Sequence, residues 1–434
     1  MILKRREKQR IKIDFTILLC LLFLGVIGII TLLSTTVQPD GSFGSLTIVY
    51  RQVLFLIFGM ILYFIFSLVD INIFKYWQVI LGIYLLTIVS LILVLLIGPV
   101  INNVQRWIVI GGIQIQPSEI AKVTVILTTT YIFTFRERYN QWLLLSLSLL
   151  VTLPIVLLVY LQPAGSMSVL ILLIWFFVAF TGLSNQLRNT IALLVSLLIM
   201  FSLFLISISG NWIYILLLFV SIILGVFGYY FRDNWKPIII GSIIVGLILG
   251  SLSVVLYKKV LRDYQRNRIE AFLNPSETSK DIGFNVDQAR IAIGSGQIWG
   301  KGFGNGTQSK RDFLPEHQTD FIYASFAEEF GLSGTLFLLS LYGILLVKIL
   351  IISIDNANNS FFSMILVGIS IKLLLEIFIN IGTNTGIIPA TGIPLPLISA
   401  GGTITVMTLF SFGLIQSIIN RSEGRDSSNI IDNF

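Results

Sequence analysis

Residues 15–33 read FTILLCLLFLGVIGIITLL, a run of nineteen residues without a charged side chain. A helix needs about 20 predominantly apolar residues to cross the hydrocarbon core of a bilayer. Similar runs recur along the chain, in which 55% of residues are hydrophobic and 12% are charged, against about a quarter charged in soluble domains. No cleavage site of small residues follows this first run, so it is expected to remain as a helix rather than be removed as a signal peptide.

The same criterion of length and hydropathy predicts twelve membrane-spanning helices, and therefore an all-α, polytopic integral membrane helix bundle. We expect one membrane domain over residues 1–434. The predicted spans cover residues 14–36, 52–70, 76–98, 118–135, 141–160, 166–184, 188–208, 212–231, 236–257, 330–353, 360–382 and 401–420.

Basic residues set the expected orientation of these spans. Six Lys and Arg residues lie within the first twelve positions, and such residues are enriched in short cytoplasmic segments. The amino end is therefore expected inside, and an even number of spans places the carboxyl end there too. Residues 258–329 would then form a large extracytoplasmic loop, since long loops cross the membrane largely regardless of charge. The net charge of +7 is thus interpreted as a signal of orientation, with no nucleic acid as a partner.

Two other outer segments are unusual for a membrane protein. Residues 98–117, GPVINNVQRWIVIGGIQIQP, are amphipathic, and residues 380–403, NIGTNTGIIPATGIPLPLISAGGT, hold three prolines and five glycines. Irregular backbone at membrane depth is tolerated only where it is buried in protein or lines a wet cavity. Both segments fall on the side of the large loop, so we expect the three to converge on one face and form a site.

Several familiar chemistries are not supported by the sequence. Cys20 is the only cysteine, which excludes a disulfide within the chain, and His317 is the only histidine, which makes a zinc cluster improbable. The glycine-rich stretch 294–307, GSGQIWGKGFGNGT, lacks the phosphate-loop spacing, because Ser295 stands where the first glycine belongs and Gly302 follows the lysine in place of Ser or Thr.

Ionisable residues inside the predicted spans form two candidate pairs. Glu119 and Lys122 are three residues apart at the start of one helix, and Lys372 and Glu376 are four apart in another, so each pair shares a helix face. Glu119 and Lys122 are interpreted as a structural ion pair that locks two helices, with a direct ligand role kept open. Lys372 and Glu376 are interpreted as a neutralised pair that is tolerated because it is buried. The large loop adds the candidate acids and bases Glu277, Asp281, Asp287, Glu316, Asp320, Glu328 and Glu329.

Longer stretches of the chain resemble the SEDS family of bacterial cell-wall polymerases, the RodA, FtsW and SpoVE group. They resemble RodA, through GTQS at 306–309 and TDFIYASFAEEFG at 319–331, more than FtsW. The stretches that carry the resemblance, in family order, are INNVQRWIVIGGIQIQPSEIAK at 101–122, RNRIEAFLNP at 266–275, QARIAIGSGQIWGKGFGNGTQ at 288–308, FLPEHQTDFIYASFAEEFGLSG at 313–334 and NIGTNTGIIPATGIPLPLISAGGT at 380–403.

The resemblance implies a peptidoglycan glycosyltransferase that polymerises lipid II during cell elongation and maintenance of cell shape. It implies a carboxylate in the large loop as general base, a class B penicillin-binding protein as partner, contact with membrane lipids, and a place in the bacterial plasma membrane. It identifies no certain cofactor and leaves a divalent cation open. Cations suited to the pyrophosphate of the substrate are Arg266, Arg268, Arg290 and Lys301, with Arg106 at the interface.

The chain departs from the family pattern in three places. Relatives usually have about ten spans, so residues 188–257 contain an apparent extra helix pair. The family's QPDxGS motif reads QPAGS at 162–166, without the aspartate. In NPSETSKDIGF, residues 274–284, Thr278 stands at the position of the catalytic aspartate, which leaves Asp281 or Glu277 to supply the base. Two other functions therefore stay open: a lipid II flippase, and an inactive scaffold for a transpeptidase.

Labelling of single cysteines tests the predicted topology on a background that lacks Cys20. The parity of the twelve spans predicts that residues 209–212 and 258–329 face outward, and that residues 232–236, which include Arg232 and Lys236, face inward. A cysteine at position 234 should react with a membrane-impermeant reagent only after the cells are opened. Reaction in intact cells would contradict the twelve-span topology.

Overall fold

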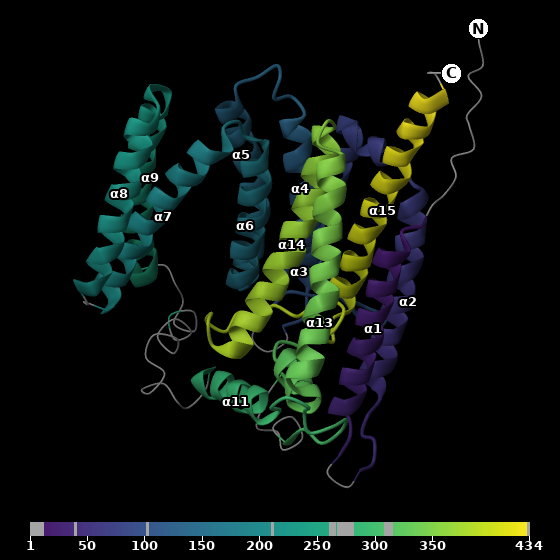
Figure 1. Cartoon of the computed structure of the whole chain (residues 1–434). Coiled ribbons are helices and arrows are strands. Elements are labelled where there is room, and N and C mark those ends of the chain that lie inside the picture. Colours follow the sequence, from purple (N-terminus) through teal and green to yellow (C-terminus); the bar gives the residue numbers. More distant parts are fainter. Residues whose placement is uncertain are drawn as a thin grey trace. The chain divides into compact units, whose positions relative to one another are not determined.

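The computed structural model describes residues 13–38, 41–100, 104–209, 212–259, 266, 282–307 and 316–431. Each of the twelve expected spans overlaps a helix, which confirms the polytopic all-α fold (Figure 1). The twelve helices are α1 (Phe15–Thr35), α2 (Thr47–Leu68), α3 (Trp77–Ile97), α4 (Pro117–Phe133), α5 (Gln141–Leu161), α6 (Gly165–Gly182), α7 (Gln186–Ser209), α8 (Ile215–Phe231), α9 (Lys236–Lys259), α13 (Ile322–Asp355), α14 (Ser360–Thr385) and α15 (Gly402–Ile431).

Short elements connect several of these helices. Three 3₁₀ helices, Ile71–Lys75, Trp212–Tyr214 and Asp233–Trp235, lie in the connections next to α3, α8 and α9. Strands β1 (Ile108–Ile110) and β2 (Ile113–Ile115) form an antiparallel hairpin between α3 and α4, and α11 (Ile282–Ser295) lies within the large polar loop. Among the described helices eleven are long and apolar enough to cross a membrane, and α4, with 17 residues, is the expected span that is not among them.

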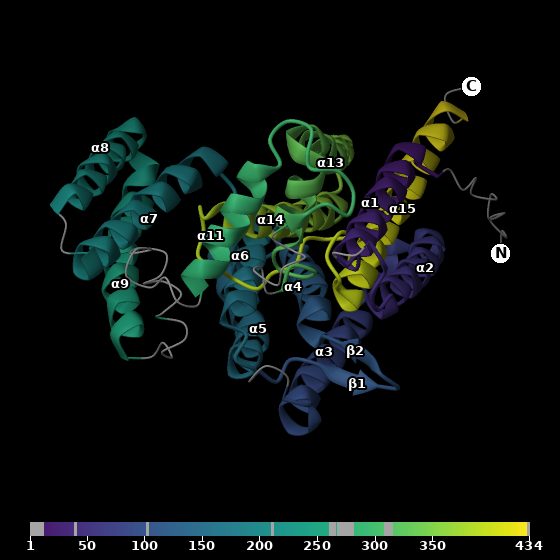
Figure 2. The same ribbon diagram turned by 90° about the horizontal axis from the view of Figure 1, so that it is seen from below.

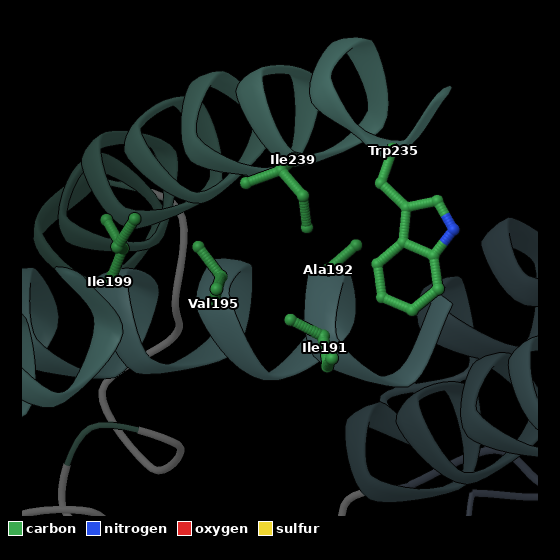
Figure 3. Packing of buried hydrophobic residues seen from close by; sticks show 6 residues of the cluster. All are labelled: Ile191, Ala192, Val195, Ile199, Trp235 and Ile239. Atoms are coloured by element: carbon green, nitrogen blue, oxygen red, sulfur yellow. The ribbon is translucent and has the colours of Figure 1, made fainter. Parts of the chain in front are cut away.

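The chain divides into two compact units, residues 1–182 with 271–434, and residues 183–270. In the second unit α7 packs along α9, and α8 contacts both. Its buried cluster consists of apolar side chains from α7, from α9 and from the turn before α9 (Figure 3). The members are Ile191, Ala192, Val195, Ile199, Trp235 and Ile239. In α8 the small residues Gly225 and Gly228 are buried, and an added Cβ at Gly228 would lie 2.8 Å from Ile239 Cδ1.

In the first unit α2 packs along α15, while α4 contacts α3, α5, α6 and α14. The amino end of α1 is capped by Asp14, whose Oδ1 accepts hydrogen bonds from the backbone of Thr16 and Ile17. Its Oδ2 lies 2.9 Å from Lys348 Nζ on α13. Capping of this kind satisfies donors that a helix start otherwise leaves unpaired.

Helix α13 begins at Ile322, ahead of the expected start of the span at 330. Gly331 interrupts it with φ 65° and ψ −165°, a conformation that is open to glycine but costly for other residues. Residues 322–330 therefore form a helical segment of the loop that joins the span at a kink. The sequence predicted the span correctly but not this extension, because the charged pair Glu328–Glu329 lowers the local hydropathy.

A close approach between α1 and the irregular segment after α14 gives a test of the packing. A Cβ added at Gly28 would lie 2.3 Å from the backbone oxygen of Leu397, so Gly28→Ala should cost about 1–3 kcal/mol through overpacking. In α13, nothing lies within 4 Å of a Cβ added at Gly343, so Gly343→Ala should leave stability unchanged or raise it by up to ~1 kcal/mol. Thermal unfolding in one detergent measures both, and equal midpoints for the two variants would contradict the packing.

Candidate functional site

The two predicted ion pairs form one buried cluster between α4 and α14. Lys122 Nζ lies 2.7 Å from Glu119 Oε2 and is also paired with Glu376 Oε1. Glu376 Oε2 in turn lies 3.2 Å from Lys372 Nζ. All four side chains are at most 2% exposed, and Glu119 Oε1 is buried without a hydrogen-bond partner in the described part of the chain.

Charge balance explains how this cluster is tolerated. Two ammonium groups face two carboxylates, so the formal charge of the cluster is zero, and an unpaired charge at this depth would cost several kcal/mol. Glu376 touches both lysines, whereas Glu119 touches one. The sequence predicted each pair within its own helix, and the structure shows in addition that the pair on α14 supports the pair on α4.

Another buried carboxylate organises the loop that follows α11. Glu328 is 0% exposed, and its Oε1 lies 2.6 Å from Lys301 Nζ. The same oxygen accepts hydrogen bonds from the backbone amide of Thr307, at 2.9 Å, and from its hydroxyl, at 2.8 Å. Charge-assisted bonds of this kind are stronger than neutral ones, so Glu328 holds residues 301–307 in one place.

The neighbouring Glu329 joins the same loop to the end of α1. Its Oε2 accepts a hydrogen bond from Ser34, and Ser34 Oγ accepts one from the amide of Gly304 at 2.9 Å. The backbones also meet closely, because a Cβ added at Gly300 would lie 2.1 Å from the oxygen of Glu329. Residues 295–307 are therefore packed backbone to backbone on the first turns of α13.

The irregular segment after α14 is held by side chains that bind backbone groups. Asn380 and Asn384, both 0% exposed, donate to the oxygen of Asp320 at 3.0 and 2.9 Å. Ser399 donates to the oxygen of Thr319 at 2.6 Å, and the amide of Ala400 donates to the oxygen of Gln318 at 2.8 Å. Residues 318–320 of the large loop and residues 380–400 are thereby joined.

The hairpin segment reaches the same region through α15. The amide of Gln116 donates to Thr403 Oγ1 at 3.0 Å, and Thr403 Oγ1 donates to the oxygen of Gln114 at 3.3 Å. Figure 1 shows α11 at the end of the bundle where α13 begins and α14 ends. These bonds confirm that the three segments converge, since the hairpin segment and residues 318–320 of the large loop are each hydrogen-bonded to residues 380–403. We call the three together the joined outer segments.

The expected catalytic carboxylates Asp281 and Glu277, and the cation Arg268, lie outside the described residues, as does Thr278. Their roles stay predictions. In the second unit, Arg266 is described, and its Nε donates to the oxygen of Tyr257 at 2.9 Å.

The other expected cations have different surroundings. The side chain of Arg290, on α11, is 60% exposed, and its Nη1 lies 3.9 Å from Asp287 Oδ1. Its Cδ lies close to the end of α14, because a Cβ added at Gly386 would be 3.3 Å from that atom. Lys301 is paired with Glu328, and Arg106 donates from Nη2 to the oxygen of Pro163. Arg290 is thus the cation of these three that faces solvent at the joined outer segments.

Within the described residues the arrangement offers carboxylates and cations. The described residues contain no group of three or more His, Cys, Asp or Glu residues that could hold a metal ion. Sequence reasoning missed Ser34, Asn380 and Asn384. A signal for the two asparagines was present, because amides four residues apart share one face of a helix and polar groups within a membrane usually have a partner.

A family model described as "Cell cycle protein" matches residues 12–217 and 211–424. "Peptidoglycan glycosyltransferase MrdB" of Escherichia coli K12 is 32% identical over 342 residues, which are 77% of this chain and 76% of the relative. "Probable peptidoglycan glycosyltransferase FtsW" of Bacillus subtilis is 29% identical over 339 residues, 78% of this chain and 72% of the relative.

Solved structures share the fold at lower identity. A chain from the work described as "Structural coordination of polymerization and crosslinking by a peptidoglycan synthase complex" gives a TM-score of 0.66 at 23% identity, over 94% of this chain and 97% of that one. The rod shape determining protein RodA of Thermus thermophilus gives a TM-score of 0.57 at 22% identity, over 94% and 96%.

Substitutions in the buried charge cluster should differ in severity. Glu376→Gln leaves two lysines with one carboxylate and should cost about 3–5 kcal/mol, whereas Glu119→Gln leaves Lys122 its second partner and should cost less. Adding Lys372→Met to Glu376→Gln restores the balance of charge and should recover part of the loss. Unfolding midpoints in detergent measure all three, and equal costs for the single variants with no recovery in the double variant would contradict the shared cluster.

Proposed function

We propose that this chain is a peptidoglycan glycosyltransferase. The premise of the proposal is that the chain belongs to the SEDS family of FtsW, RodA and SpoVE proteins. Its many apolar helices and its bacterial relatives make it a bacterial multi-pass membrane protein. The observation that carries the proposal is that four of the five stretches resembling the family, those at 101–122, 288–308, 313–334 and 380–403, converge on one hydrogen-bonded region at one end of the bundle. The curated relatives that match most of the chain are named peptidoglycan glycosyltransferases.

The substrate in this proposal is lipid II, a disaccharide peptide linked to undecaprenyl pyrophosphate. A sugar hydroxyl of the acceptor forms a bond to the anomeric carbon of the donor, and the bond from that carbon to the pyrophosphate oxygen breaks. The hydroxyl proton passes to a carboxylate of the large loop, and undecaprenyl pyrophosphate leaves as an anion. A base within hydrogen-bond reach and a cation near the leaving group are the groups that this chemistry needs.

Among the described cations Arg290 suits the leaving group best. Its guanidinium is exposed and carries a planar fork of donors that matches phosphate oxygens. Lys301 already faces the buried carboxylate of Glu328, which offsets its charge, so its proposed role is to fix the loop. Arg266 and Arg268 stay candidates for the same task, and Arg106 for the interface, through their charge.

The proposed general base is Asp281, with Glu277 as the alternative. Thr278 lacks useful basicity near neutral pH, while Asp281 precedes Gly283, which allows the backbone to bend. Asp281 also lies one residue before α11, the helix that packs on α13 and α14. A base anchored to that helix would be positioned by the joined outer segments.

A class B penicillin-binding protein is the proposed partner, and a solved structure with the same fold is described as a synthase complex that coordinates polymerization and crosslinking. We place the protein in the plasma membrane with both termini in the cytoplasm, because of the basic residues at the amino end and the even number of spans. The amide of Asp14, before α1, donates to Gln416 Oε1 of α15 at 3.1 Å, which supports a common side for α1's start and α15.

Strand synthesis from lipid II by purified protein tests the base. Asp281→Asn should lower the rate by roughly 10²–10⁴ without changing the unfolding midpoint, because it removes the proton acceptor but keeps the shape. Asp355→Asn is the matched control, since Asp355 is an exposed acid at the carboxyl end of α13, away from the joined outer segments, and it should polymerise normally. The product is measured as the length distribution of glycan strands on a gel.

Each result separates the candidates. Normal synthesis by Asp281→Asn with loss in Glu277→Gln would move the base to Glu277, and normal synthesis by both would place it elsewhere in the site. If the unaltered protein makes no strands but moves lipid II across liposomes, it is a flippase. If it does neither and still binds a transpeptidase, it is a scaffold.

A further inference from the structure

The β1–β2 hairpin has one face made entirely of isoleucine. Its register pairs Ile108 with Ile115, Val109 with Gln114, and Ile110 with Ile113. Side chains of successive strand residues point to opposite faces, and directly paired residues share a face. One face therefore carries Ile108, Ile110, Ile113 and Ile115, and the other carries Val109 and Gln114.

The half of this isoleucine face nearest the turn is exposed. Ile110 is 62% exposed and Ile113 is 50% exposed. Gly111 and Gly112 form the turn with φ of 58° and 81°, and a Cβ added to either would meet nothing within 4 Å. Two positive φ values suit the tight turn of a two-residue hairpin, so the glycines keep the tip compact and project the isoleucines beyond the bundle.

The base of the hairpin is fixed to the protein. Thr403 at the start of α15 bonds both Gln114 and Gln116, and Gln105 donates to the oxygen of Gly98 at 2.7 Å. An isolated two-stranded hairpin is at best marginally stable in water. The anchored base therefore leaves the exposed isoleucines as a surface that needs an apolar partner.

Chain connectivity places this surface at the boundary of the membrane. Ile115 lies two residues before Pro117, the first residue of α4, and the segment before β1 starts where α3 ends, beside the exposed apolar residues Leu96 and Ile97. Figure 2, which looks along the bundle from its lower end, shows both strands lying lengthwise across the view beside α3. The strands of the hairpin thus run crosswise to the bundle axis rather than along it.

We propose that the isoleucine face of the hairpin is an interfacial contact with the acyl chains of the surrounding bilayer. An amphipathic element in this position turns its apolar face toward the acyl boundary and its other face toward the headgroups. The neighbouring Trp107 is a residue type enriched at that level. The lipid contact holds the hairpin at a set depth in the membrane. Because Thr403 bonds the hairpin, the start of α15 is held at the same depth.

Site-directed fluorescence tests this contact in the full-length protein. Cys20→Ala provides the background, and Ile110→Cys or Ile113→Cys is labelled with an environment-sensitive dye. The matched controls are Val109→Cys and Gln114→Cys, from the opposite face of the same strands. Each protein is placed at a low protein-to-lipid ratio in vesicles of phosphatidylcholine and phosphatidylglycerol without any polyprenyl lipid.

Dyes at 110 and 113 should emit at shorter wavelength than dyes at 109 and 114. They should also be quenched several-fold more by nitroxide on lipid chains than by aqueous iodide, whereas at 109 and 114 iodide should be the stronger quencher. Equal quenching by iodide at all four positions would overturn the proposal. Shielding that arises only at high protein density would assign the face to a second copy. Shielding that needs added undecaprenyl phosphate would assign it to a polyprenyl chain, and either result also overturns contact with the bilayer.

Discussion

The hydrogen bonds from Asn380 and Asn384 to the backbone oxygen of Asp320 meet the main constraint on this fold, which is that non-helical backbone must have hydrogen-bond partners. After Gly386 the chain leaves helical geometry and stays irregular up to α15, and irregular backbone inside a membrane protein must find partners for its polar groups. The amides of α14, with Ser399, supply partners for residues 319–320 and for Ile393 and Leu395. The joined outer segments are stable in this arrangement because side chains of the protein itself supply hydrogen-bond partners for their backbone groups.

The same requirement accounts for the charged groups that the bundle buries. Glu376 balances Lys122 across two helices, and Glu328 gathers Lys301 and the amide of Thr307 around one oxygen. A buried carboxylate with several donors is a stiff anchor, because moving any donor leaves the charge short of a partner. The frame around these carboxylates is thus costly to rearrange, which suits a glycosyltransferase that repeats one reaction geometry.

Much of the fold could be predicted from the sequence, because long apolar runs have one main structural outcome in a membrane. The convergence of the outer segments was also predictable, from loop parity and the prolines of 380–403. Contacts between distant segments, such as Lys122 with Glu376 or Ser34 with Glu329, were not, since helix periodicity shows which face a residue occupies but not which helix that face meets. The extension of α13 to Ile322 was hidden by its glutamates, whose burial depends on those same contacts.

Hydrogen exchange in an Asn384→Leu variant measures most directly whether buried amides hold the outer segments. The substitution removes a donor to Asp320 and an acceptor for the amide of Ala324, which should cost about 1–3 kcal/mol locally. Amides of residues 318–324 should then exchange about tenfold faster or more, while those of α1 to α3 stay unchanged. Unchanged exchange at 318–324, or an equal rise in every helix, would show that these segments are held by something other than the asparagine bonds.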